Sequence, residues 1–275
     1  MRLREAIAAA AARLAQTSGT SRLDAELLMA HALGVERDTM LLRHLDDPAP
    51  VAFDGLVERR AAHEPIAYIT GRRAFWTIEL AVGLGVLIPR PDSETLIEAA
   101  VAHFGEQGPA TILDLGTGPG SLLLAALSQW PDACGLGVDR SERARGYFET
   151  NVAALGLEDR ARFRLGDWID GLEDQWDLIL CNPPYVESGD DLPPDVALWE
   201  PDGALFAGAD GLDDYRRLAP HLGRLLAPGG IACVEIGAGQ EEKVLSLFKK
   251  SGVSIESRSD LKGIARCLII GLDPE

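Results

Sequence analysis

Apolar residues in the first quarter of the chain recur at the three- and four-residue spacing of amphipathic helices. Leu3, Ile7 and Leu14 share one apolar face at the start. Ser21 is a candidate N-cap of a second helix and Gly34 its expected stop. The pattern predicts four helices, at residues 3–17, 22–33, 38–45 and 52–63. We therefore expect residues 1–73 to form a small helical domain.

Residues 74–90 follow a different period. The segment 75–82 alternates apolar and polar residues well enough to predict a β-hairpin. This stretch is expected to be a linker with two strands of its own.

From residue 91 onward, short apolar runs alternate with helical stretches, a pattern typical of a doubly wound α/β sheet. Asp92, Ser93 and Glu94 are candidates to cap a helix running to about Phe104. Five parallel strands, each followed by a helical stretch, and two closing strands are expected at 111–115, 133–138, 161–165, 176–181, 230–236, 253–257 and 265–271. Since only seven residues separate the last two, the last strand should run antiparallel to its neighbour. Residues 91–275 should form one α/β domain.

The charge of the chain is unevenly distributed. The net charge is −17 over 275 residues, yet residues 1–73 hold ten basic and ten acidic side chains, so the whole excess falls in 74–275. Between Leu165 and Tyr215 there are fourteen acidic side chains and no Lys or Arg. Phosphate backbones and anionic lipids repel such a chain, which excludes a generic nucleic-acid coat protein and argues against membrane binding.

The cysteines indicate a reducing compartment. Cys134, Cys181, Cys233 and Cys267 are widely spaced and lie in or beside strand-like apolar runs. We expect buried, reduced thiols. No apolar run approaches the roughly 20 residues of a membrane span, and we expect a cytoplasmic protein.

A glycine-rich turn directly follows the first strand of the α/β domain. It consists of Gly116, Thr117, Gly118, Pro119 and Gly120. Glycines let the backbone turn sharply and approach a ligand closely. The spacing differs from G-x-G-x-x-G, which favours a nucleoside over a dinucleotide pyrophosphate. The alternative is a tight strand-to-helix turn without a ligand.

Polar and aromatic residues follow the next two strands. Asp139 ends the second strand, where a carboxylate can accept hydrogen bonds from both ribose hydroxyls; a helix cap is the alternative. Asp167 and Trp168 follow the third strand and offer an acceptor and a flat surface for an adenine ring, although Trp168 is equally well read as a core aromatic.

The segment with the most chemical information is Asn182-Pro183-Pro184-Tyr185, at the carboxyl end of the fourth strand. The prolines remove two N–H donors and leave the Asn182 side-chain oxygen and the Pro183 carbonyl as acceptors. A planar NH2 group can donate one hydrogen to each while Tyr185 lies against its face, which exposes the nitrogen to an electrophile. The alternative is a Pro-Pro turn that merely ends a strand. The five histidines show no metal-ligand spacing, and we expect no metal.

Together these motifs resemble the S-adenosylmethionine-dependent amino-methyltransferases. Further stretches are similar to the HemK/PrmC family, the glutamine N5-methyltransferases of peptide chain release factors. These stretches are residues 66–71 together with Phe75 and Trp76, then residues 88–95, 200–201, 204–212 and 260–266. The Asn-Pro-Pro-Tyr tetrapeptide alone is shared with adenine N6-methyltransferases of nucleic acids.

The resemblance implies a Rossmann-like class I methyltransferase domain, preceded by a helical domain that helps hold a class I release factor. S-adenosylmethionine would contact Gly116, Thr117, Gly118, Pro119, Gly120, Asp139, Trp168 and Asn182. The glutamine of a Gly-Gly-Gln motif would contact Asn182, Pro183, Pro184 and Tyr185, with Asn182, Pro183 and Tyr185 as the catalytic set. Pro119 departs from the family, which usually has a small residue there; we expect tolerance, because proline suits the first turn of a helix.

Two other functions remain open. An adenine N6-methyltransferase would use the same tetrapeptide, but would have to bring phosphates past the acidic run 165–215. A catalytically silent binding protein would use the fold as an interaction surface, although the motifs for cofactor and amide are both intact.

Overall fold

The computed structural model describes residues 1–249 and 253–272. The chain divides into two compact units. The first contains Met1–Arg72 and Leu192–Glu200, and the second contains Arg73–Asp191 and Pro201–Glu275. Over the described ranges, no helix combines the length and the apolar character needed to cross a membrane.

The first unit is built from short helices around one apolar core. They are α1 (Leu3–Leu14), α2 (Ser21–Leu33), α3 (Arg37–Arg43), α4 (Ala52–Ala61) and α5 (Ile66–Thr70). Leu3, Ile7 and Leu14 are fully buried, as the apolar spacing predicted. Gly34 ends α2 in the left-handed conformation, also as predicted, because glycine adopts it without a steric penalty.

Two details of this unit differ from the prediction. Ser21 is the first residue of α2 and Thr20 holds the N-cap position, so the expected cap is shifted by one residue. The five-residue α5 was missed, because it is too short to show a helical period.

A buried ion pair ties α2 and α4 together and reaches a segment distant in sequence. Arg60 on α4 is 6% exposed and Asp24 on α2 is 4% exposed, and Arg60 Nε donates to Asp24 Oδ2 at 2.7 Å. Asp195, on the short helix α9 (Pro194–Ala197), lies 3.7 Å from Arg60 Nη2. The segment Leu192–Glu200, which contains α9, belongs to the first unit.

The second unit opens with the predicted hairpin, formed by β1 (Arg72–Phe75) and β2 (Ile78–Ala81). Asn151 fixes β2 to the rest of the unit, because its side chain accepts from the Ala81 N–H and donates to the Ala81 carbonyl. A 3-10 turn, η1 (Pro91–Ser93), then leads into α6 (Glu94–Phe104).

The main sheet of this unit has seven strands in the order β5-β4-β3-β6-β7-β9-β8. Its strands are β3 (Thr111–Leu115), β4 (Cys134–Asp139), β5 (Ala161–Leu165), β6 (Trp176–Cys181), β7 (Leu226–Glu235), β8 (Val253–Ser259) and β9 (Ala265–Leu272). The first five are parallel, and β9 is antiparallel to both β7 and β8, as predicted.

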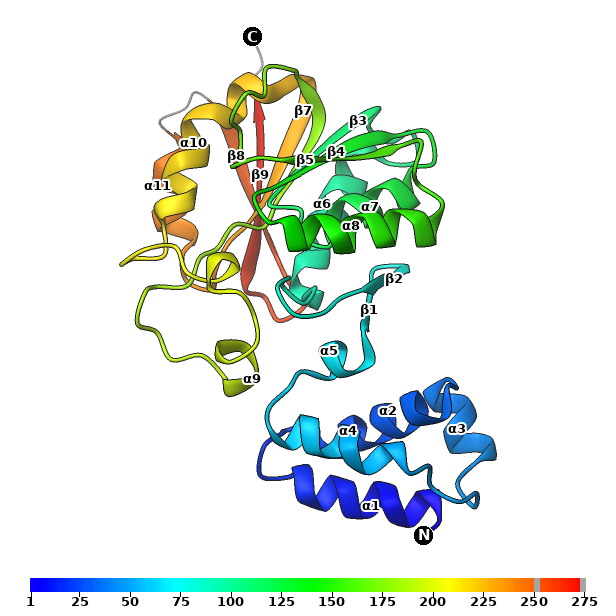
Figure 1. Ribbon diagram of the computed structural model, residues 1–275. Helices are drawn as coiled ribbons and strands as arrows, with labels where there is room; N and C mark the ends of the chain where they lie inside the picture. Colours follow the sequence, from blue (N-terminus) through cyan, green and yellow to red (C-terminus); the bar gives the residue numbers. More distant parts are fainter. Residues whose placement is uncertain (250–252, 273–275) are drawn as a thin grey trace. The chain divides into compact units, whose positions relative to one another are not determined.

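Helices cover both faces of this sheet. On one face lie α6, α7 (Ser121–Gln129) and α8 (Glu142–Leu155), and on the other α10 (Asp213–Leu225) and α11 (Glu241–Phe248) (Figure 1). The chain passes from β3 outward to β5 and returns to β6 beside β3, so the direction of winding reverses between β3 and β6. Ligands of open α/β sheets bind at such a point, outside the carboxyl ends of the strands.

Two predictions for this unit are wrong. No helix follows β5, because residues 166–175 form turns that lead directly to β6. Cys134 is exposed, since it begins β4 at the rim of the sheet, whereas Cys181, Cys233 and Cys267 are buried free thiols as expected.

Candidate functional site

An open cavity lies at the winding reversal, wholly within the second unit. Its free space is about 830 Å³, including the part open to solvent. Seven residues predicted from the sequence line it: Gly116, Gly118, Asp139, Asp167, Trp168, Asn182 and Pro184. Other lining residues come from the linker (Val86 and Leu87), from the turn after β4 (Arg140) and from the segment that follows α9 (Pro201, Gly203 and Ala204).

The glycine turn brings backbone close to the cavity. Gly116 has φ 73°, and a Cβ there would lie 3.1 Å from Cζ3 of Trp168. A side chain is therefore excluded both by the backbone conformation and by the tryptophan ring. Gly118 faces open space, with no atom within 4 Å of the position of a Cβ.

The other three residues of the turn form its frame and do not line the cavity. Thr117 is buried, and its hydroxyl donates to Asp114 Oδ2 at 2.6 Å. The carbonyl of Pro119 accepts from Asn151 Nδ2 at 2.8 Å. Pro119 precedes the Gly120 N-cap of α7, so it lies before the helix and not in its first turn.

Asp139 ends β4 and lines the cavity with its carboxylate held in place. Oδ2 accepts from the Gly118 N–H and Oδ1 from the Ser141 N–H, both at 2.9 Å. Burial raises the pKa of Asp139 against these hydrogen bonds, which lower it. The helix-cap alternative is wrong, because the Ser141 side chain caps α8 by accepting from the Ala144 N–H. Each carboxylate oxygen retains acceptor capacity for a ligand hydroxyl.

Trp168 is both a cavity residue and a packing residue. It has φ 51°, and its Nε1 donates to Asp214 Oδ1 at 2.9 Å. Its ring lies against Gly116 and packs against the core of the unit. Its neighbour Asp167 also lines the cavity and accepts from Arg217 Nη2 at 2.7 Å.

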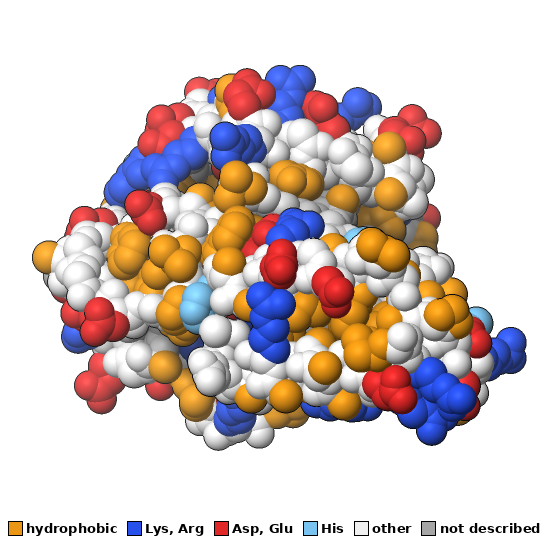
Figure 2. Space-filling view, turned by 60° about the horizontal axis from the view of Figure 1, so that its bottom comes forward, with side chains coloured by type: hydrophobic (Ala, Val, Ile, Leu, Met, Phe, Trp, Pro, Cys, Tyr) orange, Lys and Arg blue, Asp and Glu red, His pale blue; other side chains and the backbone are white. Residues whose placement is uncertain are grey.

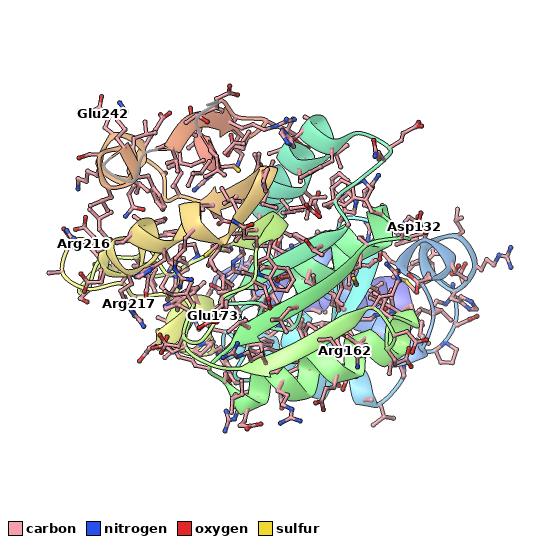
Figure 3. The ribbon with its side chains drawn as sticks, turned by 90° about the horizontal axis from the view of Figure 1, so that it is seen from above. Asp132, Arg162, Glu173, Arg216, Arg217 and Glu242 are labelled. Atoms are coloured by element: carbon pink, nitrogen blue, oxygen red, sulfur yellow. The ribbon has the colours of Figure 1, made fainter. Side chains whose placement is uncertain are left out.

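The acidic run is partly neutralised by two arginines that follow it directly in the sequence. Arg216 on α10 pairs with Asp210 and Asp213, and the adjacent Arg217 pairs with Asp167 and Asp214. Figure 3 labels both arginines. On the face drawn in Figure 2, acidic and basic side chains are interspersed. The sequence argument treated the acids of residues 165–215 as unpaired, which overstated the local negative charge.

The Asn-Pro-Pro-Tyr segment follows β6 without a break. Asn182 and Pro184 line the cavity, whereas the lining does not include Pro183 or Tyr185. Leu115 pairs with Cys181 across β3 and β6, so Gly116 and Asn182 follow neighbouring strand ends. Asn182 Nδ2 donates to the hydroxyl of Ser93 at 3.2 Å.

Tyr185 is anchored at both its side chain and its backbone. Its hydroxyl donates to Glu235 Oε1 at 3.3 Å, and its carbonyl accepts from Gln240 Nε2 at 2.9 Å. Burial raises the pKa of the Tyr185 hydroxyl, and the charge of Glu235 raises it further. The phenol is therefore neutral and serves as a donor.

Sequence reasoning missed Ser93, Glu235 and Gln240 as parts of this site. Ser93 was interpreted as a helix cap, but its side chain makes no capping hydrogen bond. Burial raises the pKa of Glu235 to about 7, while hydrogen bonds from Ser93 and Tyr185 lower it. The available signal was that 88–95, which includes Ser93, is one of the stretches that carry the family resemblance.

Within residues 1–249 and 253–272, no three His, Cys, Asp or Glu side chains are grouped so that they could hold a metal ion.

Comparison with known sequences identifies the family. Residues 5–71 match the PrmC N-terminal domain, and residues 93–197 match the methyltransferase small domain. The release factor glutamine methyltransferase of Rhodospirillum rubrum is 44% identical over 254 residues, which cover 90% of this chain and 78% of the relative. That of Cereibacter sphaeroides is 40% identical, over 96% of both chains.

Solved structures support the fold. The ribosomal protein L11 methylase of Lactobacillus delbrueckii subsp. bulgaricus matches with a TM-score of 0.51 at 18% identity, over 67% of this chain and 81% of that one. At this identity the likeness concerns the fold alone. The fold agrees with these sequence matches, since it has a helical domain, a hairpin and a mixed seven-stranded sheet. Because the relatives align over most of the chain, the chain belongs to the release factor glutamine methyltransferases, an S-adenosylmethionine-dependent family.

Proposed function

We propose that this protein transfers a methyl group from S-adenosylmethionine to the side-chain amide nitrogen of the glutamine in the Gly-Gly-Gln motif of class I peptide chain release factors. The supporting observation is that the glycine turn and Asn182 follow paired strand ends and line one cavity. A cofactor site and an amide site are thereby brought together.

The cavity residues fit an adenosine-bearing cofactor. Gly118 leaves open space where a side chain would intrude, and Asp139 offers two carboxylate oxygens beside it. Trp168 supplies a flat apolar surface at the rim. Gly116, Gly118, Asp139 and Trp168 are the residues that hold S-adenosylmethionine directly, while Thr117, Pro119 and Gly120 shape the turn.

When bound, S-adenosylmethionine would supply an electrophilic methyl group for the amide nitrogen, its sulfur leaving as a neutral thioether and the displaced amide proton passing to solvent. The chain itself orients the glutamine. Asn182 Oδ1 and the Pro183 carbonyl each accept a hydrogen bond from one N–H group of the glutamine amide. Tyr185 limits the position of that amide from the side. Catalysis is thus positioning and electrostatics, with no nucleophilic side chain.

The two parts of the chain have separate tasks. The first unit, residues 1–72 and 192–200, holds the body of the release factor, and the second unit, residues 73–191 and 201–275, which includes the hairpin linker, carries the transfer. The buried thiols Cys181, Cys233 and Cys267 are compatible with a cytoplasmic location.

Peptide mass mapping tests the function. The protein is incubated with S-adenosylmethionine and a class I release factor, and a parallel reaction contains nucleic acid instead. We expect a gain of about 14 Da, one CH2, on the Gly-Gly-Gln peptide and none on adenine. A release factor with this glutamine replaced is the control.

Cofactor binding, measured by titration, separates the remaining outcomes. Binding without any gain of mass on the release factor would overturn the proposal, methyl on adenine alone would favour a nucleic-acid methyltransferase, and failure to bind S-adenosylmethionine would favour a silent binding protein.

A further inference from the structure

We propose that Ser93 and Glu235 are positioning residues that set the direction of the Asn182 side-chain amide, so that its oxygen is presented to the substrate. The identity of that substrate rests on the function proposed above. The direction of the Asn182 amide is a property of the chain and is testable without substrate.

Three segments far apart in the sequence meet at this point. Ser93, at the end of η1, is 4% exposed, and Glu235, the last residue of β7, is 1% exposed. Asn182 Nδ2 lies 3.2 Å from Ser93 Oγ, and the Ser93 hydroxyl faces the Glu235 carboxyl group closely enough to lower its pKa. Glu235 also accepts from the Tyr185 hydroxyl at 3.3 Å. Tyr185 therefore contacts this buried carboxyl group directly, and Asn182 is connected to it through Ser93.

The chemistry of these groups determines which way each hydrogen points. In its ionised form, which predominates above about pH 7, the Glu235 carboxylate accepts hydrogen bonds and donates none, so the single hydrogen of the Ser93 hydroxyl is directed to Glu235. Ser93 Oγ is then an acceptor on its other side, and only the NH2 branch of Asn182 can satisfy it. The oxygen branch of Asn182 is consequently left for the cavity.

The contacts of Ser93 and Glu235 are not explained by stability alone. Ser93 occupies the N-cap position of α6 without capping it, although a serine cap stabilises a helix by about 1 kcal/mol. Glu235 Oε2 is buried without a hydrogen bond, which is costly for a carboxylate. A serine that capped α6 would stabilise the protein more than Ser93 does, and a neutral residue in place of Glu235 would avoid the cost of the unpaired oxygen.

The direction of the Asn182 amide matters for transfer to an amide. The substrate nitrogen carries two hydrogens and requires two acceptors, Asn182 Oδ1 and the Pro183 carbonyl. If the Asn182 amide were reversed, its NH2 group would face the substrate NH2 group, and one buried donor on each side would be unpaired. Loss of the Ser93 hydroxyl should therefore slow transfer more than it weakens binding of the release factor.

Nuclear magnetic resonance provides the direct test, because the chain contains only two asparagines, Asn151 and Asn182. With 15N in asparagine side chains, each gives one amide pair, and Asn182→Ala assigns them. We expect Ser93→Ala to accelerate hydrogen exchange of the Asn182 amide at least tenfold, about 1.4 kcal/mol. Asn151, which donates to the carbonyls of Ala81 and Pro119, is the internal reference and should not change.

Kinetics with a release factor provide the second readout. Ser93→Ala and Glu235→Gln should lower kcat by about tenfold or more, with smaller changes in KM and in S-adenosylmethionine affinity. Ser93→Thr keeps the hydroxyl and should restore most of kcat. Ser128→Ala is the matched control, because it removes a hydroxyl that donates to a carbonyl within α7.

Each outcome decides the proposal. Unchanged exchange of the Asn182 amide in Ser93→Ala would overturn it, and so would a kcat within twofold of wild type. A wild-type protein that transfers no methyl group would contradict the proposed function, while the exchange measurement would still decide the roles of Ser93 and Glu235.

Discussion

At the scale of single residues, Asn182 has one branch of its amide committed to a buried hydroxyl and the other available to the cavity. The side chain contributes an acceptor, and replacing it by a methyl group removes that acceptor while leaving the glycine turn and Asp139 in place.

We predict that Asn182→Ala retains most of its affinity for S-adenosylmethionine and loses transfer by well over tenfold, about 1.4 kcal/mol. Calorimetric titration of the cofactor and single-turnover methyl transfer measure the two quantities. Survival of transfer within tenfold would show that the side chain has no essential acceptor role.

Asp114 shows how burial acts on a single carboxyl group below the glycine turn. Oδ2 accepts from Thr117 and from the Leu123 N–H, whereas Oδ1 is buried without a partner. Burial raises the pKa of Asp114 to about 7 against these hydrogen bonds, and the charge of Asp139 raises it further. The folded protein therefore binds this proton more tightly than the unfolded chain does.

The consequence is a pH-dependent loss of stability. As the pH rises from about 4 to about 7, the unfolded chain ionises Asp114 before the folded protein does, and folding becomes less favourable. We predict that the free energy of unfolding of Asp114→Asn, taken relative to that of wild type, is higher at pH 8 than at pH 5 by roughly 2–3 kcal/mol. Urea unfolding of both proteins at the two pH values measures this; a constant difference would contradict it.

At the scale of elements, those with a clear period or a sharp stop were predictable. The strands β3, β5 and β6 appear at the predicted residues, and Gly34 ends α2. The failures have a common cause: α5 and the turns after β5 are too short to carry a period. Their conformation depends on neighbours that are remote in sequence.

The buried ion pair between α2 and α4 supports a prediction at this scale. Removing one partner leaves an unpaired buried charge, so Arg60→Ala should lower the free energy of unfolding by about 3 kcal/mol. Arg13→Ala in the same unit is the control, because the Arg13–Glu58 pair is more than half exposed on both sides and should contribute at most about 1 kcal/mol. Equal losses in thermal or urea unfolding would contradict this interpretation.

At the scale of the whole molecule, the net charge of −17 governs which partners approach. Arg216 and Arg217 neutralise part of the acidic run, but the molecule as a whole still repels polyanions.

We predict that duplex DNA or RNA added at low salt leaves the rate of release factor methylation within about twofold, because few phosphate contacts can form. Initial rates with and without nucleic acid measure this. Inhibition that weakens as salt is added would reveal a phosphate-binding surface and revive the nucleic-acid alternative.

The sequence by itself determined most of the elements, the antiparallel last strand and the motifs around Gly116, Asp139, Trp168 and Asn182. These depend on local rules: hydrophobic period, glycine conformation, proline chemistry and the position of a residue at a strand end. Only the tertiary structure decided which motif residues line the cavity and which form its frame. It also decided that Ser93 and Glu235 meet Asn182, because strand order and burial bring together residues 93, 182 and 235, which no local pattern connects.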